Sequence, residues 1–159
     1  MNWAAQEDPQ GDPQTILGWE RAEQLNLCAG CHARRTKLTE VMKPGVHFDD
    51  QFRIQTINNN FYHADGQILE EDYVLGSFMQ SKMFHKDVKC SNCHNPHSME
   101  LYYPGNLLCM QCHDITYNSK EHHFHEEETL AGQCIECHMT GDVYMGNDFR
   151  RDHSFRNPR

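Results

Sequence analysis

All eight cysteines of this 159-residue chain belong to one motif, Cys-x-x-Cys-His, which occurs four times, at residues 28–32, 90–94, 109–113 and 134–138. This spacing is typical of c-type haem attachment. The two thiols add to the porphyrin vinyl groups as thioethers, and the imidazole that follows then lies under the iron as its proximal ligand. The motif predicts thioethers at Cys28, Cys31, Cys90, Cys93, Cys109, Cys112, Cys134 and Cys137, and proximal ligands at His32, His94, His113 and His138.

Other uses of paired cysteines explain less of the pattern. A disulfide framework also takes an even number of cysteines, but it does not require a histidine after each pair. A thioredoxin-type dithiol occurs once, beside a βαβ pattern that is absent here. Four zinc knuckles could hold two ions, but the histidine that follows each pair would then have no role as a ligand. We therefore expect four haem c groups, with zinc or disulfides as the alternatives.

The composition contains too few hydrophobic residues to fill the interior of a folded domain with side chains alone. Only 38% of the residues are hydrophobic, and the formal net charge is -9, a balance that is poor for a self-sufficient core. Four haems would supply the missing apolar volume. We expect a mainly α fold with much coil and little or no sheet, a small multihaem cytochrome c wrapped around four covalent haems. Residues 1–14 are expected to be a loose arm and residues 15–159 a single domain.

Local patterns predict a few elements. A helix is expected from Thr15 into the first motif, and another over residues 69–86, where apolar residues recur every three or four positions and predict core packing for Met79 and Met83. Residues 58–60 and 64–66 are expected to form turns. Short spacings predict that the last three haems cluster, whereas 57 residues separate the first motif from the second. The first haem is therefore expected at one end of the row.

Histidines exceed the number that four proximal positions require. Four of the twelve belong to the motifs, and eight remain: His47, His63, His85, His97, His122, His123, His125 and His153. Because each iron takes a second axial ligand, we expect about half of these eight to bind iron. Methionine is the other common ligand and would raise the reduction potential.

The chain resembles the doubled-CxxCH multihaem cytochrome domain of bacterial proteins, which is often fused to tetratricopeptide repeats. It is more distantly similar to the tetrahaem cytochromes of nitrifiers. The resemblance covers residues 20–159 and rests on "CAGCHARR", "YHADGQILEEDYVLGSFMQSKM", "VKCSNCHNPHS", "GNLLCMQCH", "GQCIECHM" and "RRDHSFRNPR". No repeat array follows residue 159 in this sequence.

The resemblance implies which histidines are distal ligands. It favours His63, His97 and His153, which lie in its most characteristic segments, and one member of "HHFH" as the fourth. We choose His125 there, with His122 next, and keep His47 and His85 as further alternates. His97 follows His94 by only three residues, so it is expected to reach a neighbouring iron rather than its own.

Enough histidines are present to make all four irons six-coordinate, which predicts a low-potential electron-transfer protein rather than an enzyme. The alternative is a multihaem enzyme with one five-coordinate haem that acts on a small nitrogen or sulfur compound. Expected partners are redox proteins, with end-to-end self-association into a filament as a hypothesis. The acidic charge disfavours nucleic acid, and no apolar run is long enough for a membrane span. Thioether attachment predicts a periplasmic or extracellular location, although this sequence contains no export signal.

Overall fold

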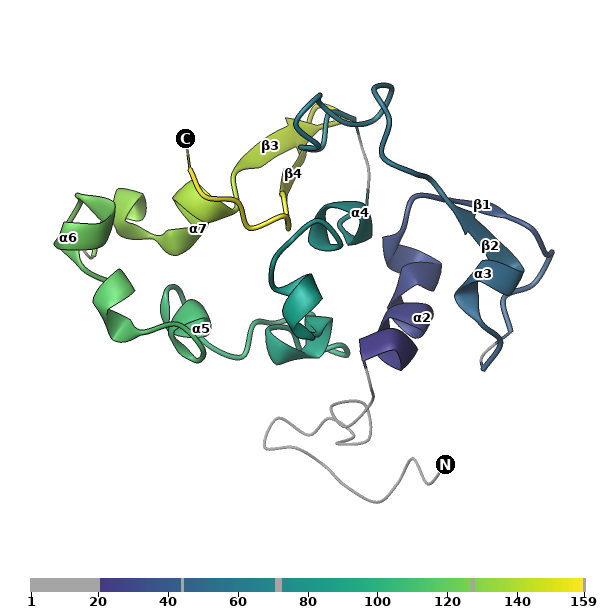
Figure 1. Cartoon of the computed structure of the whole chain (residues 1–159), viewed down its shortest axis with the longest axis horizontal. Helices are drawn as coiled ribbons and strands as arrows, with labels where there is room; N and C mark the ends of the chain where they lie inside the picture. Colours follow the sequence, from purple (N-terminus) through teal and green to yellow (C-terminus); the bar gives the residue numbers. More distant parts are fainter. Residues whose placement is uncertain (1–20, 44, 71–72, 127, 159) are drawn as a thin grey trace, which may run out of the picture. The chain divides into compact units, whose positions relative to one another are not determined.

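The computed structural model describes residues 21–43, 45–70, 73–126 and 128–158, and the chain divides into two compact units (Figure 1). The first-motif unit comprises residues 20–88 and 141–155. Of the described residues, the three-motif unit comprises 89–126, 128–140 and 156–158. The second, third and fourth motifs thus share one unit, as their short spacings predict. The expected arm over residues 1–14 and the start of the first helix lie outside the described residues.

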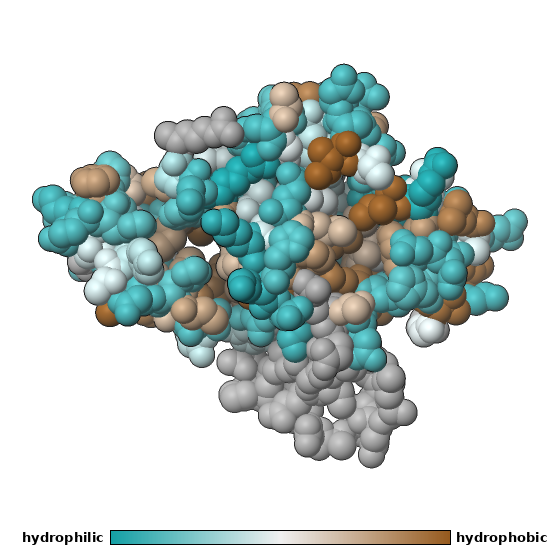
Figure 2. Space-filling view, viewed as in Figure 1, coloured by the Kyte–Doolittle hydropathy of each residue, from teal (hydrophilic) through white to brown (hydrophobic). Residues whose placement is uncertain are grey.

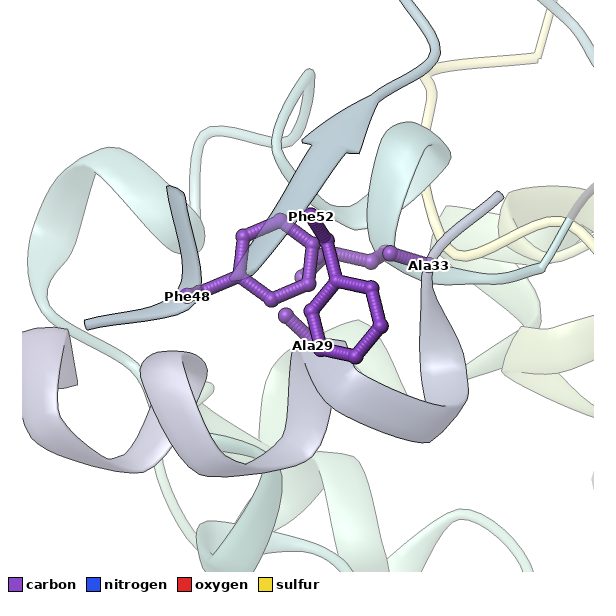
Figure 3. Packing of buried hydrophobic residues seen from close by; sticks show 5 residues of the cluster. Ala29, Ala33, Phe48 and Phe52 are labelled. Atoms are coloured by element: carbon purple, nitrogen blue, oxygen red, sulfur yellow. The ribbon is translucent and has the colours of Figure 1, made fainter. Parts of the chain in front are cut away.

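The first-motif unit begins with α2 (Arg21–His32), which ends in the first motif. Strands β1 (Arg35–Lys37) and β2 (Phe52–Ile54) pair antiparallel, with α3 (Phe48–Gln51) directly before β2. Figure 3 shows the rings of Phe48 and Phe52 beside the small Ala29 of α2 and Ala33, the residue that follows α2. The two rings are 5.2 Å apart between centroids, and this cluster, completed by Leu75, is the apolar core of the unit.

The rest of this unit contains α4 (Leu75–Phe78), the 3-10 turn η1 (Phe84–Lys86) and a hairpin of β3 (Gly141–Tyr144) with β4 (Asp148–Arg151). The hairpin turn contains Met145 and Gly146, both with positive φ, 49° and 85°. The tyrosine hydroxyl of β3 donates a hydrogen bond to the carbonyl of Ile68 at 3.3 Å, so the hairpin is attached to the body of the unit.

The predicted helix over residues 69–86 is wrong as a continuous element. Among the described residues of this stretch, helical turns form in α4 and η1, and serine side chains bond to the backbone within α4 and at the start of η1. Ser77 Oγ donates to the carbonyl of Val74 at 3.0 Å, and Ser81 Oγ accepts from the N–H of Phe84 at 2.9 Å. Met79 is 40% exposed instead of packing in a core. Both predicted turns are confirmed, with side-chain-stabilised bends at residues 58–60 and a positive φ at Gly66.

The three-motif unit is built from single helical turns. Its described elements are η2 (Cys90–Asn92), α5 (Leu107–Met110), η3 (Ile115–Tyr117), α6 (Lys120–His123), η4 (Leu130–Gly132) and α7 (Cys134–His138). No described apolar side chain of this unit is buried, and Phe124 and Leu130 are 80% and 82% exposed. Figure 2 shows such apolar residues in brown, exposed among hydrophilic ones.

The predicted fold class, mainly α with little or no sheet, is wrong. The structure contains two antiparallel two-stranded sheets, β1–β2 and β3–β4, and its described helices other than α2 have only three to five residues. The strands form because Phe52 is buried against α2 and because a positive-φ turn joins β3 to β4. Neither feature gives a period-2 pattern in the sequence. Within the described part of the chain, no helix has the length and apolar character needed to cross a membrane.

Candidate haem sites

Each motif is folded around one helical turn. The first motif ends α2, and the fourth is the whole of α7. In the second and third motifs, the N–H groups of His94 and His113 donate to the carbonyls of Cys90 and Cys109, both at 3.0 Å. Residues at positions i, i+3 and i+4 share one face of a helical turn. The two cysteines and the histidine of each motif are therefore directed to one side, as attachment to one porphyrin requires.

His138 has the hydrogen bond that an iron-ligating imidazole needs. Its Nδ1 lies 2.8 Å from the backbone carbonyl of Arg156, and because a carbonyl only accepts, Nδ1 carries the proton. Nε2 then keeps its lone pair for a metal. Metal-bound histidines commonly donate their other ring N–H to a carbonyl in this way, which fixes the tautomer and the ring orientation.

The His122 ring lies opposite the His138 ring. The two planes are 5° from parallel, and the centroids are 6.3 Å apart. Two metal–nitrogen bonds of about 2.0 Å and two ring radii across one iron add up to roughly 6 Å between ring centres. The separation therefore matches that of two axial imidazoles on one iron. The rings come from α6 and α7, so the pair joins two elements of the three-motif unit.

Tyr117 continues this row of rings towards the third motif. Its ring is 5.1 Å from that of His122 and 6.4 Å from that of His113, nearly perpendicular to both. Tyr117, His122 and their neighbours Thr116, Ser119 and Glu121 line an open hollow of about 450 Å³.

Cysteine thiols of neighbouring motifs lie close together in this unit. Cys109 donates a hydrogen bond to the sulfur of Cys134, which raises the pKa of Cys109 and lowers the pKa of Cys134 to about 7. Burial, followed by the nearby Cys112 thiol, raises the pKa of Cys93. The side chain of Gln111 also donates to the carbonyl of Asn92 at 3.1 Å. The third motif therefore lies between the second and the fourth.

His153 is the favoured distal candidate with the best-defined ring. Its Nδ1 lies 2.9 Å from the carbonyl of Arg151, so Nδ1 carries the proton and Nε2 keeps its lone pair, as in His138. Its backbone N–H donates to Oγ of the fully buried Ser77 at 3.1 Å. The ring is half-buried and meets Phe155 edge to face at 5.9 Å.

The other three favoured histidines are exposed and are held through their backbones. The N–H of His63 donates to the carbonyl of Gln67 at 2.8 Å, and that of His97 to Oδ1 of Asn95 at 2.8 Å. The ring of His125 lies parallel to that of His123, at 6.5 Å between centroids, rather than opposite a motif histidine. The ring near and parallel to that of His138 is the one of His122, which sequence reasoning placed second.

The remaining alternates have other contacts. Nδ1 of His47 accepts a hydrogen bond from the N–H of Asp49 at 3.4 Å and caps α3. The ring of His85 meets Phe84 edge to face at 5.3 Å. Sequence reasoning did not select His123, whose buried Nε2 has no hydrogen-bond partner among the described residues. Of the other proximal candidates, His32 is exposed and His94 is half-buried.

All eight cysteines lie among the described residues, and none forms a disulfide. In the same part of the chain, no three histidine, cysteine or acidic side chains converge to hold a metal ion directly. No protein-family model matches the chain, and the comparisons with curated proteins and with solved structures likewise gave no match. The functional conclusion therefore depends on the motifs and their geometry.

Proposed function

We propose that the protein carries electrons on four covalently attached c-type haems. The attachment residues are the eight cysteines and the proximal ligands are His32, His94, His113 and His138, as the motifs predict. We assign His122 as the distal ligand paired with His138, and keep His153, His63 and His97 as distal ligands for the others. His125 becomes the alternate to His122.

The parallel rings of His122 and His138 carry this proposal. One imidazole on each side of an iron leaves no open position for a substrate, so such a site stores and passes electrons instead of performing chemistry on a ligand. The hydrogen bond from His138 to the carbonyl of Arg156 supports the same assignment, because it holds Nε2 ready for the iron.

The packing of the three-motif unit gives independent support for a cofactor. Its described apolar side chains all stay exposed or half-buried, and its motif helices have at most five residues. Isolated helices of this length are unstable in water without tertiary packing. Apolar porphyrin faces would supply that packing, and thioether bonds would hold the short helices in place.

Each haem, when bound, supplies a one-electron Fe(III)/Fe(II) couple. Two imidazoles on one iron favour Fe(III) relative to methionine ligation, which lowers the reduction potential. Residues 89–140 contain seven acidic residues and two lysines, a formal charge of 2 − 7 = −5. This charge also stabilises Fe(III). It favours a redox partner with a basic docking face, since opposite charges steer association.

Location follows from how the thioethers are made. In bacteria, haem is joined to Cys-x-x-Cys-His outside the cytoplasmic membrane, so we infer a periplasmic or extracellular site of action. Redox proteins in that compartment are the proposed partners. Association of copies end to end is a further possibility for passing electrons and is tested by the oligomeric state of the haem-loaded protein in solution.

Mass spectrometry of the denatured protein tests the cofactor. The expected mass exceeds that of the polypeptide by four haems, and the double variant Cys109→Ala with Cys112→Ala should have three. Thioethers also keep the haems on the chain during acid–acetone extraction. Haem-free polypeptide with bound zinc, or a mass lowered by disulfide formation, would instead support one of the two alternatives.

Absorption spectroscopy tests the electron-transfer assignment. All four irons should be low-spin in both oxidation states, and the reduced protein should not bind carbon monoxide. A high-spin haem that readily binds carbon monoxide, nitrite or hydroxylamine would identify an open coordination site and favour the enzymatic alternative.

A further inference from the structure

Asn106 connects the third and fourth motifs through its side-chain amide. Its Oδ1 accepts a hydrogen bond from the backbone N–H of Cys134 at 2.8 Å. Its Nδ2 donates to the backbone carbonyl of Gly132 at 2.9 Å and to Oδ1 of Asn118 at 2.6 Å. These three bonds use the amide oxygen and both N–H groups, so the side chain is fixed in one orientation.

The same residue starts one motif helix and caps the other. The backbone carbonyl of Asn106 accepts from the N–H groups of Cys109 and Met110 at 2.9 and 3.0 Å, at the beginning of α5. Cys134 is the first residue of α7, and its N–H has no acceptor within its own helix. Gln133, which precedes α7, provides no side-chain cap. Asn106 therefore supplies the acceptor that α7 lacks.

Gly105 allows the backbone to turn just before Asn106, close to the residue that precedes the fourth motif. Its φ is +54°, a value that favours glycine, and a Cβ added there would be 3.1 Å from Oε1 of Gln133. The segment leading into the third motif thus passes close to the residue that precedes the fourth. The thiols of Cys109 and Cys134 are also in hydrogen-bonding contact, so the first attachment atoms of the two motifs are neighbours.

We propose that Asn106 is a positioning residue that fixes the third and fourth haem attachment sites against each other, so that their haems form one magnetically and electronically coupled pair. This inference rests on the proposed function, because it needs a haem at each site. Asn106 contacts no motif cysteine side chain in the bonds described above. Its effect is exerted through the backbone of Gly132 and Cys134.

The link between the second and third motifs offers a matched control. Gln111 donates from Nε2 to the carbonyls of Asn92 and Leu108, at 3.1 and 2.9 Å. It is also an amide in the same unit, and it lies within the third motif. Gln111→Leu removes an inter-motif hydrogen bond of that side chain while leaving the Asn106 bonds in place.

The test compares Asn106→Leu with Gln111→Leu in the haem-loaded full chain. Hydrogen exchange at the Cys134 amide, followed by mass spectrometry, should become roughly tenfold faster in Asn106→Leu, the effect of losing one good hydrogen bond. Electron paramagnetic resonance of the oxidised protein should lose the interaction-broadened signal of the coupled pair in this variant. Gln111→Leu keeps every Asn106 bond, so it should leave hydrogen exchange at the Cys134 amide as in the unmodified protein.

Asn106→Asp provides a second variant that keeps an acceptor for the Cys134 N–H but cannot donate to Gly132 while it is ionised. It should retain slow exchange at Cys134 and show weaker coupling than Gln111→Leu. An Asn106 variant that carries four haems by mass and shows unchanged coupling would overturn this inference but not the proposed function. Absence of covalent haem from the unmodified protein would overturn the proposed function, and the inference with it.

Discussion

The ring of His122 lies parallel to the ring of His138, with 5° between the planes and 6.3 Å between the centroids. Fifteen residues separate the two histidines in the chain, and only His138 belongs to a Cys-x-x-Cys-His motif. The His138 ring is oriented by its hydrogen bond to the carbonyl of Arg156, and Tyr117 contacts the His122 ring from the side. Both rings are therefore positioned by neighbours.

If the fourth motif carries the proposed haem, replacing His122 with methionine should change that haem. A thioether ligand favours Fe(II), so one reduction potential should rise by on the order of 100 mV. Redox titration followed by visible absorption measures this shift. His125→Met is the matched control two residues away, and it should leave all four potentials unchanged. A shift in His125→Met and none in His122→Met would return the assignment to His125.

Removing the Phe52 ring should destabilise the first-motif unit. Phe52 is 3% exposed and packs on Phe48 and α2, so Phe52→Ala should lower the free energy of unfolding by about 3–5 kcal/mol. Urea denaturation followed by circular dichroism measures the loss. Leu38→Ala, at a side chain 58% exposed, should change it by less than about 0.5 kcal/mol. Equal effects of the two substitutions would contradict this core.

Ser77→Ala tests the hydrogen bond that holds the backbone of His153. The Ser77 hydroxyl is buried and accepts from the backbone N–H of His153, so the substitution leaves that N–H without its acceptor. The expected cost is about 1–3 kcal/mol in the free energy of unfolding, measured in urea. The spectrum of one haem should shift with it if His153 is a ligand, whereas Ser98→Ala at an exposed position should change neither.

The thiol of Cys134 should titrate unusually low in the haem-free, reduced chain. Hydrogen bonding from Cys109 lowers its pKa to about 7 from an ordinary value of 9.0, so its thiolate forms as the pH rises through about 7. Alkylation by iodoacetamide, quantified by peptide mass spectrometry, should rise to half its maximal rate near that pH. Cys109→Ala removes the donor and should slow alkylation of Cys134 at pH 7 by about tenfold or more.

Cys137→Ala is the control for this pH dependence, since it removes a cysteine of the same motif that takes no part in the Cys109–Cys134 hydrogen bond. The rate profile of Cys134 should stay the same in that variant. A half-maximal rate near pH 9 in the otherwise unmodified haem-free chain would show that the two thiols are not in contact when no haem is attached.

Residue types and spacing in the sequence predicted the attachment chemistry. Positions i, i+3 and i+4 share one helical face whatever the surroundings, so a Cys-x-x-Cys-His run directs its three side chains together wherever it forms a helical turn. The turns at residues 58–60 and 64–66 were predictable for a similar reason, because asparagine and glycine favour local backbone conformations that need no distant partner.

Tertiary structure decided the features that depend on distant contacts. The helix expected over residues 69–86 is interrupted between α4 and η1, where Ser81 Oγ accepts from the N–H of Phe84. Ser77 of α4 accepts from the N–H of His153, 76 residues away in sequence. The β1–β2 pair depends on the burial of Phe52 against α2, and three-residue strands are too short to show a period.

The choice of distal ligand among the eight histidines outside the motifs also depends on distant contacts. Composition shows that enough imidazoles are present for four irons, and a resemblance favours some segments. Three histidines, however, lie within residues 122–125, and spacing alone cannot tell which of them approaches His138. Which ring faces His138 depends on how α6 and α7 are held, through hydrogen bonds such as those of Asn106. The sequence by itself determined the four repeated motifs on which the proposed haem attachment rests. Only the tertiary structure decided which side chains meet across each motif, because those distances are set by folding and not by spacing along the chain.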